Sequence, residues 1–514
     1  MNKKNIFAFA VALSMVLFGA TNVMALKNGL ARTPPMGFNT WNYFNCNGGG
    51  GHGRVNQALI DSIANAFVSQ GMAAVGYQYV NIDDCWAEAS RDNAGGMVAS
   101  KTDFPNGMRP VVDYVHSKGL KLGIYSDVAS KTCSGQMPGM SGHENQDADT
   151  FVAWGIDYIK VDWCSGTGGQ SLPSYVKIRN ALTQAVTAMK PTVPTAHAVV
   201  FSMCNWGQDN TWLWADSVGN LWRTTGDITS QWGSMLGNMD QSQAHYAYSR
   251  IGAWNDPDMM EVGIGDFTNA AMARSHFSLW CMMAAPLVTG TDVRTQSLSA
   301  ATKTILTNSD VIGVDQDSLG GDTTMGIIQG RKVTTGNSEV WVKLLKGKTK
   351  SEYAILFFNR ANTGAVSMSV TTAQIASIGG DIASGKTYTV RDLWAHTNLA
   401  DWTAGGTYTT PSTVPVNDVF MIRLMIGTSV LSPLANVKVS EMRVQPENEQ
   451  VIVQAAERSG PISVNLVNAK GVVVLSKHGA GPQCNIPTRG LARGLYFVNV
   501  VSAKEQFTQK IILK

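Results

Sequence analysis

The sequence predicts an α/β chain: a parallel (β/α)8 TIM barrel, followed by an antiparallel β-sandwich and a small C-terminal β-domain. From residue 31 to about residue 295, a short apolar run alternates eight times with a helix-like stretch, which is typical of this barrel. After Asp317, short β-branched or aromatic segments separated by Gly, Thr and Ser replace that pattern and indicate antiparallel strands. The 514 residues are enough for about three domains.

Each apolar run of the barrel ends in polar or aromatic residues. The ends are expected near Trp41, Asp84, Asp127, Cys164, Asn205, Asp227, Asp258 and Asp292. Between them lie helical repeats such as Leu59, Ile63 and Phe67, and Gly71 is a plausible stop for that helix. An open doubly wound sheet is the alternative fold. It is less favoured, because no GxGxxG motif opens a first strand and helix.

The N-terminus has the layout of a secretory signal peptide over residues 1–25. Lys3 and Lys4 precede an apolar stretch over residues 6–20, and Val23-Met24-Ala25 predicts cleavage after Ala25. An uncleaved anchor is the alternative, but the apolar stretch is short for a spanning helix. No later segment is long and apolar enough to span a membrane, so we expect a secreted or cell-surface protein.

The remaining boundaries follow from changes in composition. We expect the barrel over residues 26–320, the antiparallel β-sandwich over residues 321–427, and a small β-domain over residues 434–514. In the last of these, Ile462-Val464-Leu466 and Tyr496-Val498-Val500 alternate as in half-buried strands.

Charge and cysteine usage exclude several classes of function. The net charge is only +3 and no long basic run occurs, which argues against a nucleic-acid partner. The seven cysteines form no CxxC motif, and no HExxH motif occurs, so no metal site is predicted. Asp315-Gln316-Asp317 begins like a calcium loop, but Leu319 stands at the next ligand position.

Acidic and aromatic side chains gather where the barrel strands are expected to end, which is where such barrels carry their active sites. The carboxylates are Asp83, Asp84, Asp127, Asp162, Asp227, Asp256, Asp258 and Asp292, beside Trp41, Trp86, Tyr125, Trp163, Trp206, Lys160 and Arg223. Carboxylates accept hydrogen bonds from sugar hydroxyls and aromatic faces stack on pyranoses, so a monosaccharide pocket is predicted, and a glycosidase needs two such carboxyl groups. Structural roles remain open: Asp83-Asp84 can cap a helix or bind Ca²⁺, and Asp162 can pair with Lys160 on the same strand face.

The stretch from about Leu30 to Gly320 resembles glycoside hydrolase family 27, the α-galactosidase (melibiase) family. The matching motifs are LARTPPMG from Leu30, NIDDCW from Asn81, LGIYSD from Leu122, KTC from Lys131, KVDWC from Lys160, CNWG from Cys204, WRTTGDI from Trp222 and WNDPDM from Trp254. The segment with Arg391-Asp392-Leu393-Trp394 resembles the C-terminal domain of that family.

The resemblance implies a role for each matching residue. Asp162 matches the catalytic nucleophile and Asp227 the catalytic acid/base. The implied substrate-binding residues are Trp41, Asp83, Asp84, Tyr125, Lys160, Asn205, Trp206, Arg223, Asp258 and Met259. Two disulfides, Cys46–Cys85 and Cys133–Cys164, are implied as well. No metal or organic cofactor is needed.

The implied reaction is hydrolysis of terminal α-linked galactose with retention, by double displacement. We expect Lys160 to keep Asp162 ionised, and the charge of Asp162 to raise the pKa of Asp227 so that it starts protonated. Once Asp162 is glycosylated, Asp227 can act as a base toward water.

Other activities within and outside the family remain alternatives. Asn205 and Trp206 belong to the loop expected to face the C2 group of the sugar, where Trp206 disfavours an α-N-acetylgalactosaminidase. The Asp83-Asp84 pair favours galactose over a β-L-arabinopyranoside. A non-catalytic galactose-binding surface protein is a further alternative. The presence of both Asp162 and Asp227 argues against it.

The C-terminal domain resembles more weakly the sorting domain of type IX secretion, which implies a secretion machinery as partner. The residues concerned are Ile462 to Leu466, Gly471, Arg493-Gly494-Leu495-Tyr496 and Lys510 to Lys514. An accessory module that binds carbohydrate is the alternative.

Overall fold

The structure is a computed structural model, and it describes most of the barrel and sandwich together with segments of the C-terminal domain. The described residues are 26, 28–46, 51–164, 170–193, 196–318, 327–346, 352–426, 443–447, 450–454, 462–468, 473–479, 483–502 and 506–513. The expected signal peptide and the expected boundaries at residues 320, 427 and 434 lie outside them. No helix within these ranges is long and apolar enough to cross a bilayer.

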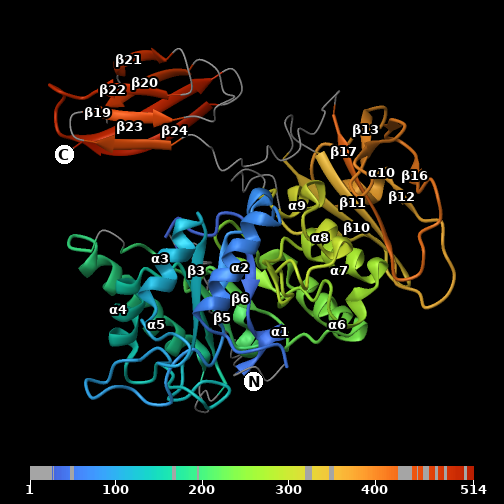
Figure 1. Ribbon diagram of the computed structural model, residues 1–514. Coiled ribbons are helices and arrows are strands. Elements are labelled where there is room, and N and C mark those ends of the chain that lie inside the picture. The colour runs from blue at the N-terminus through green and yellow to red at the C-terminus, as the bar shows by residue number, and fades with distance from the viewer. Residues whose placement is uncertain are drawn as a thin grey trace, which may run out of the picture.

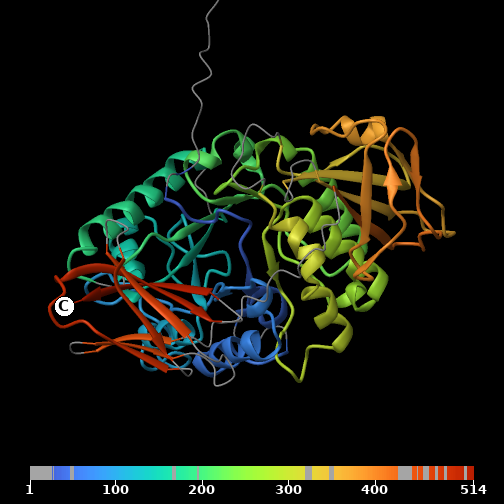
Figure 2. The same ribbon diagram turned by 90° about the horizontal axis from the view of Figure 1, so that it is seen from above.

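Eight parallel strands form one sheet in the order β7-β6-β5-β4-β3-β2-β1-β8 (Figures 1 and 2). They are β1 (Met36–Asn39), β2 (Tyr79–Asn81), β3 (Lys121–Asp127), β4 (Tyr158–Asp162), β5 (Val200–Cys204), β6 (Leu221–Arg223), β7 (Trp254–Asp256) and β8 (Leu287–Thr289). A parallel bridge between Met260, just after β7, and Thr289 of β8 joins the two ends of the sheet. The predicted (β/α)8 barrel is therefore confirmed.

Helices cover the outside of the strands (Figure 2). They are α1 (Trp41–Phe44), α2 (Gln57–Ser69), α3 (Arg109–Ser117), α4 (Glu144–Trp154), α5 (Ser171–Met189), α6 (Trp232–Gln243), α7 (Ala270–Met282), α8 (Ala300–Leu306) and α9 (Ser309–Asp315). Short 3₁₀ turns cover Ala73–Val75, Gln208–Leu213, Ala215–Ser217, Tyr246–Tyr248 and Gly265–Thr268. In α2 the Asn56 side chain caps the first turn, and Gly71 adopts φ +81° just beyond the helix end, as predicted from the sequence.

Several strands end before the acidic residues that the sequence suggested as their ends. β2 ends at Asn81 and β6 at Arg223, so Asp83, Asp84 and Asp227 lie in the loops that follow. Asp162 is instead the last residue of β4, directly beside Asp127 of β3 in the register. In the loop after β2, the backbone N–H groups of Asp83 and Asp84 bond to side-chain oxygens of Thr40 and Asp83, and no hydrophobic pattern specifies such bonds.

The β-sandwich packs on the side of the barrel that carries α6 to α9 (Figures 1 and 2). Its elements are β9 (Arg331–Lys332), β10 (Ser338–Leu345), β11 (Glu352–Asn359), β12 (Ser369–Thr371), α10 (Thr372–Ala376), β13 (Thr387–Asp392), β14 (Thr397–Asn398), β15 (Trp402–Thr403), β16 (Thr407–Thr409) and β17 (Val419–Met425). The main sheet runs in the order β14-β13-β17-β11-β10-β9. Arg274 of α7 pairs with Asp418, and the buried Lys343 of β10 donates to the Val314 carbonyl at 2.6 Å, so charged contacts fix the two domains together.

The C-terminal domain contains two antiparallel sheets, drawn in red in Figure 1. Its strands are β18 (Arg443–Glu447), β19 (Gln450–Gln454), β20 (Ile462–Asn468), β21 (Val473–Gly479), β22 (Gln483–Pro487), β23 (Gly494–Ser502) and β24 (Gln506–Leu513). One sheet has the order β18-β19-β22 and the other the order β21-β20-β23-β24. The predicted alternation is confirmed, because Ile462, Val464, Leu466, Tyr496, Val498 and Val500 are all buried in one core.

Candidate active site

Asp162 and Lys160 share one face of β4, two residues apart, and both point toward the same polar cluster. Only 6% of the Asp162 surface is exposed. The Tyr125 hydroxyl of β3 donates to Oδ2 of Asp162 at 3.1 Å, while Lys160 Nζ lies 3.7 Å from Oδ1. Lys160 Nζ also donates to Oδ2 of Asp83 at 3.0 Å. The cation therefore joins the end of β4 to the loop after β2.

Asp83 and Asp84 are both buried, and each has defined partners. Oδ2 of Asp83 accepts from the Asn39 amide at 2.7 Å, in addition to Lys160. Asp84 accepts from the backbone N–H of Cys85 at 2.7 Å through Oδ1, and from that of Ser134 at 3.0 Å through Oδ2. These bonds hold two carboxylates side by side at the mouth of the barrel.

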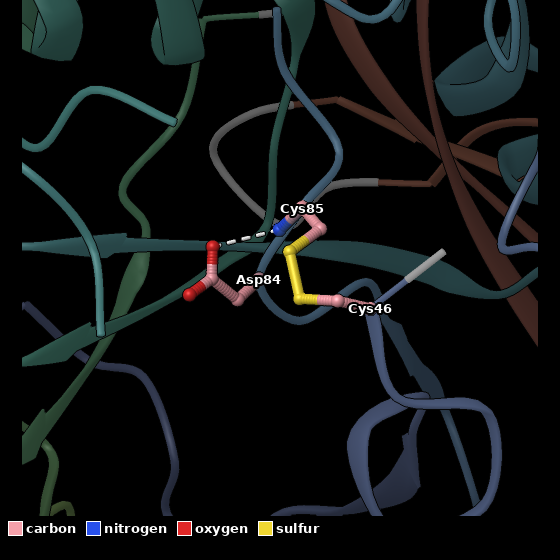
Figure 3. A group of neighbouring side chains, drawn as sticks. All are labelled: Cys46, Asp84 and Cys85. Carbon is pink, nitrogen blue, oxygen red and sulfur yellow. Dashed lines mark hydrogen bonds between the residues drawn. A yellow bond between two sulfur atoms is a disulfide. The ribbon is translucent and has the colours of Figure 1, made fainter. Parts of the chain in front are cut away.

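Two disulfides tie the loops around these carboxylates, and both are the implied pairs. Cys46–Cys85 links the loop after α1 to the residue that follows Asp84 (Figure 3). Cys133–Cys164 links the loops after β3 and β4, and the Cys133 sulfur lies 3.3 Å from Oδ2 of Asp162. Asp84 with the first pair, and Asp127 with the second, form groups of the kind that can hold a metal. Their sulfur atoms are bonded to each other, however, and offer no thiolate ligand.

Asp227, in the loop after β6, is far more accessible than Asp162. Its side chain is 71% exposed. Arg223 at the end of β6 is buried, and its Nη2 lies 3.1 Å from Oδ1 of Asp227 and 2.7 Å from Oδ2 of Asp258. The Trp206 indole N–H donates to the same Oδ1 of Asp227 at 2.8 Å. One guanidinium thus holds two carboxylates.

The pKa values of Asp162 and Asp227 run opposite to the expectation from the sequence. Burial raises the pKa of Asp162 to about 7, although the Lys160 charge acts to lower it. Partial burial acts to raise the pKa of Asp227, but the Arg223 charge, the Trp206 hydrogen bond and the Lys160 charge hold it below its usual value. The expected increase of the Asp227 pKa is therefore wrong, because the cations and the indole N–H near Asp227 outweigh its partial burial.

Three residues of the site adopt left-handed backbone conformations, which side chains other than glycine rarely do. They are Cys85 at φ 76°, Trp206 at φ 55° and Asp258 at φ 89°. Such conformations persist where surrounding structure enforces them, and they concentrate at functional sites. Each of the three belongs to a loop at the carboxyl ends of the strands, where the predicted pocket residues also lie.

Of the other predicted site residues, Trp41 and Met259 lie beside the carboxylates, whereas Asn205 uses its polar atoms within its own loop. Trp41 begins α1 with its backbone N–H on Oδ1 of Asn39 at 2.8 Å, and Met259 is buried beside Asp258 around a small cavity in the barrel. Asn205 differs from its expected role as a sugar ligand. It is fully buried, and its side-chain amide donates to Ser171 Oγ and to the Gln208 carbonyl, both at 2.8 Å. Its polar atoms are therefore used inside the loop.

Sequence reasoning assigned no role to several residues that line or support the cluster. Asn39 supports Asp83, and the Cys204 thiol lies 3.6 Å from Arg223. Asp127 was already among the carboxylates of the predicted pocket; it accepts from the backbone N–H groups of Ala129 and Cys164, and burial raises its pKa to about 6. Asn39 had a readable signal, since it stands two residues before Trp41 at the end of a barrel strand.

Comparisons with known proteins agree with this geometry. The family model "Alpha galactosidase A" matches residues 33–317, and "Alpha galactosidase C-terminal beta sandwich domain" matches residues 335–424. "Secretion system C-terminal sorting domain" matches residues 445–514. The α-galactosidase of Oryza sativa subsp. japonica is 46% identical over 377 residues, which are 73% of this chain and 82% of the relative. α-Galactosidase 2 of Arabidopsis thaliana is 44% identical over 395 residues, 77% of this chain and 91% of the relative.

Solved structures agree as well. The crystal structure of α-galactosidase I from Mortierella vinacea covers 78% of this chain and 99% of its own, with a TM-score of 0.67 and 31% identity. Barrel and sandwich are thus shared with known members of one family. The chain belongs to the α-galactosidase family of glycoside hydrolases, family 27.

Proposed function

We propose that this protein is a retaining exo-α-galactosidase that removes terminal α-linked galactose from oligosaccharides or galactomannan side chains. The observation that carries the proposal is the contrast between its two carboxyl groups. Asp162 is buried beside Lys160 and Tyr125, whereas Asp227 is accessible and held by Arg223 and Trp206. A retaining glycosidase needs two such carboxyl groups, and the motif matches assign the nucleophile role to Asp162 and the acid/base role to Asp227.

In the first step, an oxygen of Asp162 attacks the anomeric carbon of galactose. The bond from that carbon to the glycosidic oxygen breaks, and Asp227 gives its proton to the departing oxygen. The product is a galactosyl ester on Asp162. Lys160, 3.7 Å from Asp162, stabilises the charged carboxylate before the attack.

In the second step, Asp227 is ionised and takes a proton from a water molecule. The water oxygen bonds to the anomeric carbon, the ester bond to Asp162 breaks, and galactose leaves with its original configuration. Asp162 is again a carboxylate and Asp227 again an acid, so protons and bonds balance over one cycle.

Recognition of galactose is assigned to the carboxylates around this pair. Asp83 and Asp84 would accept hydrogen bonds from the O4 and O6 hydroxyls, and Asp258, paired with Arg223, from a further hydroxyl. Trp41 and Tyr125 would supply the apolar wall. We assign Asn205 to support of the Trp206 loop, because its amide is already bonded within that loop.

The test is hydrolysis of the p-nitrophenyl glycosides of α-galactose, α-N-acetylgalactosamine and β-L-arabinopyranose, with D162A and D227A as matched variants. We expect the wild type to hydrolyse the α-galactoside in preference to the other two, and D162A to lose this hydrolysis. Preference for either of the other two glycosides would refute the substrate assignment. A folded wild-type protein without turnover on any of them would favour a non-catalytic galactose-binding protein.

We also propose that the protein reaches the cell surface or the medium. The support is the match of residues 445–514 to a secretion sorting domain, together with two disulfides of the kind that persist outside the cytoplasm. An N-terminal signal peptide would begin export, and the secretion machinery would recognise the C-terminal domain. Mass spectrometry of protein recovered from the native medium tests both ends, and an intact N-terminus would refute the signal peptide.

A further inference from the structure

The loop after β5 is built to present the Trp206 indole to Asp227. Asn205 anchors the loop start through Ser171 and Gln208. The backbone then enters left-handed conformations at Trp206, φ 55°, and at Gly207, φ 78°. A tryptophan in that conformation carries backbone strain, which the buried anchor at Asn205 maintains.

The hydrogen bonds of Asp227 distinguish its two oxygens. Oδ1 accepts from the Trp206 indole N–H at 2.8 Å and from Arg223 Nη2 at 3.1 Å. Both groups are donors only, so neither can accept a proton from Asp227. No described residue donates to Oδ2 within hydrogen-bond distance. A proton on the carboxyl group must therefore reside on Oδ2.

We propose that Trp206 is a positioning residue for the acid/base step: with Arg223 it fixes Asp227 through Oδ1, so that Oδ2 carries and receives the transferred proton. This inference rests on the proposed α-galactosidase function. In this proposal the indole N–H positions Asp227. The ring of Trp206 can still form part of the pocket wall near the C2 group of the sugar.

The charges facing Asp227 determine how loss of the indole N–H changes its titration. They come from Arg223 on β6, Lys160 on β4 and Asp258 after β7, and the buried Cys204 thiol on β5, whose pKa burial raises, stays neutral beside them. The Trp206 hydrogen bond favours the ionised form of Asp227, so its removal raises the pKa of that group. The pKa of Asp227 is the lower of the catalytic pair, and the acid limb of kcat/KM therefore moves to higher pH.

The first experiment compares W206F with the wild type and with W214F. Trp214 lies downstream of the same β5 loop, and its indole N–H donates to the Asp209 carbonyl at 3.1 Å, so W214F removes an indole hydrogen bond that does not involve Asp227. In W206F we expect the acid limb to rise by about one pH unit. In W214F we expect no shift of that limb.

The second readout is the dependence on the leaving group. A sugar alkoxide needs protonation as it leaves, whereas p-nitrophenolate leaves readily without it. In W206F we expect kcat/KM to fall about tenfold more for an α-galactosyl disaccharide than for the p-nitrophenyl galactoside. Equal losses on both substrates with an unmoved acid limb would overturn the proposal and leave Trp206 as a wall of the sugar pocket.

A third readout needs no turnover and separates this inference from the proposed function. The indole ¹H–¹⁵N signal of Trp206 is the one that disappears in W206F. We expect it to move upfield in D227A, which removes the acceptor, and to stay in place in D162A. An unchanged signal in D227A overturns the proposal, even when the wild-type enzyme cleaves α-galactosides.

Discussion

The Tyr125 hydroxyl donates a hydrogen bond to Oδ2 of Asp162 over 3.1 Å, from one barrel strand to the next. The two residues stand on β3 and β4, two register positions apart. Tyr125 is itself almost fully buried, so its ring has little freedom to turn away. A buried residue of the barrel therefore holds the proposed nucleophile in its orientation.

Replacing Tyr125 with Phe tests that relationship. A hydrogen bond to a charged group contributes about 1.5–3 kcal/mol, so Y125F is expected to lower kcat/KM for the p-nitrophenyl galactoside about 10- to 100-fold. Y114F is the matched control, since the Tyr114 hydroxyl pairs with Asn65 on the exposed side of α3. Unchanged activity in Y125F would show that the bond plays no part in turnover.

The pH profile follows from the two pKa values of the catalytic pair. Turnover requires one proton on the pair, because Asp227 must carry it while Asp162 is ionised. The pKa of Asp227 lies below its usual value and that of Asp162 is about 7. We expect kcat/KM to be bell-shaped, with an acid limb below the usual pKa of an aspartate and an alkaline limb near pH 7. A plateau that continues to pH 9 would contradict this assignment.

Replacing Asn205 distinguishes a role in supporting its loop from a role in binding the sugar. N205A removes three hydrogen bonds of a buried side chain, to Ser171, Thr211 and the Gln208 carbonyl, and should lower the free energy of unfolding by about 2–3 kcal/mol. Chemical denaturation measures this effect. A rise in KM with unchanged stability would instead restore Asn205 as a direct sugar ligand.

Replacing Lys343 tests how much the interface between barrel and sandwich contributes to stability. Its ammonium group is fully buried and donates to the Val314 carbonyl at the end of α9, near the buried Asp315. K343M should cost about 3 kcal/mol, because it leaves buried polar groups without a partner. K386M, on the outer part of the same sandwich, should change stability by less than about 0.5 kcal/mol. Equal melting temperatures for the two variants would show that the interface adds little.

The sequence predicted the architecture better than the chemistry of individual side chains. Alternating runs identified the barrel, and the YIKVD pattern placed Lys160 and Asp162 on one face, because strand periodicity alone determines this. The low pKa of Asp227 could not be read in the same way. It depends on Arg223 and on Trp206, which comes from a different loop, and no local pattern specifies where that loop turns. The inward orientation of Asn205 was missed for the same reason.

Because two disulfides tie its loops, the pocket depends on whether its surroundings are oxidising or reducing. Cys133 contacts the Asp162 carboxylate, and Cys85 follows Asp84 directly. The cytoplasm keeps thiols reduced, whereas compartments beyond the inner membrane allow them to pair. A newly made chain thus has untied loops around its pocket until it has left the cytoplasm. Pairing of the four cysteines is therefore also the step that fixes the loops carrying Asp84 and contacting Asp162.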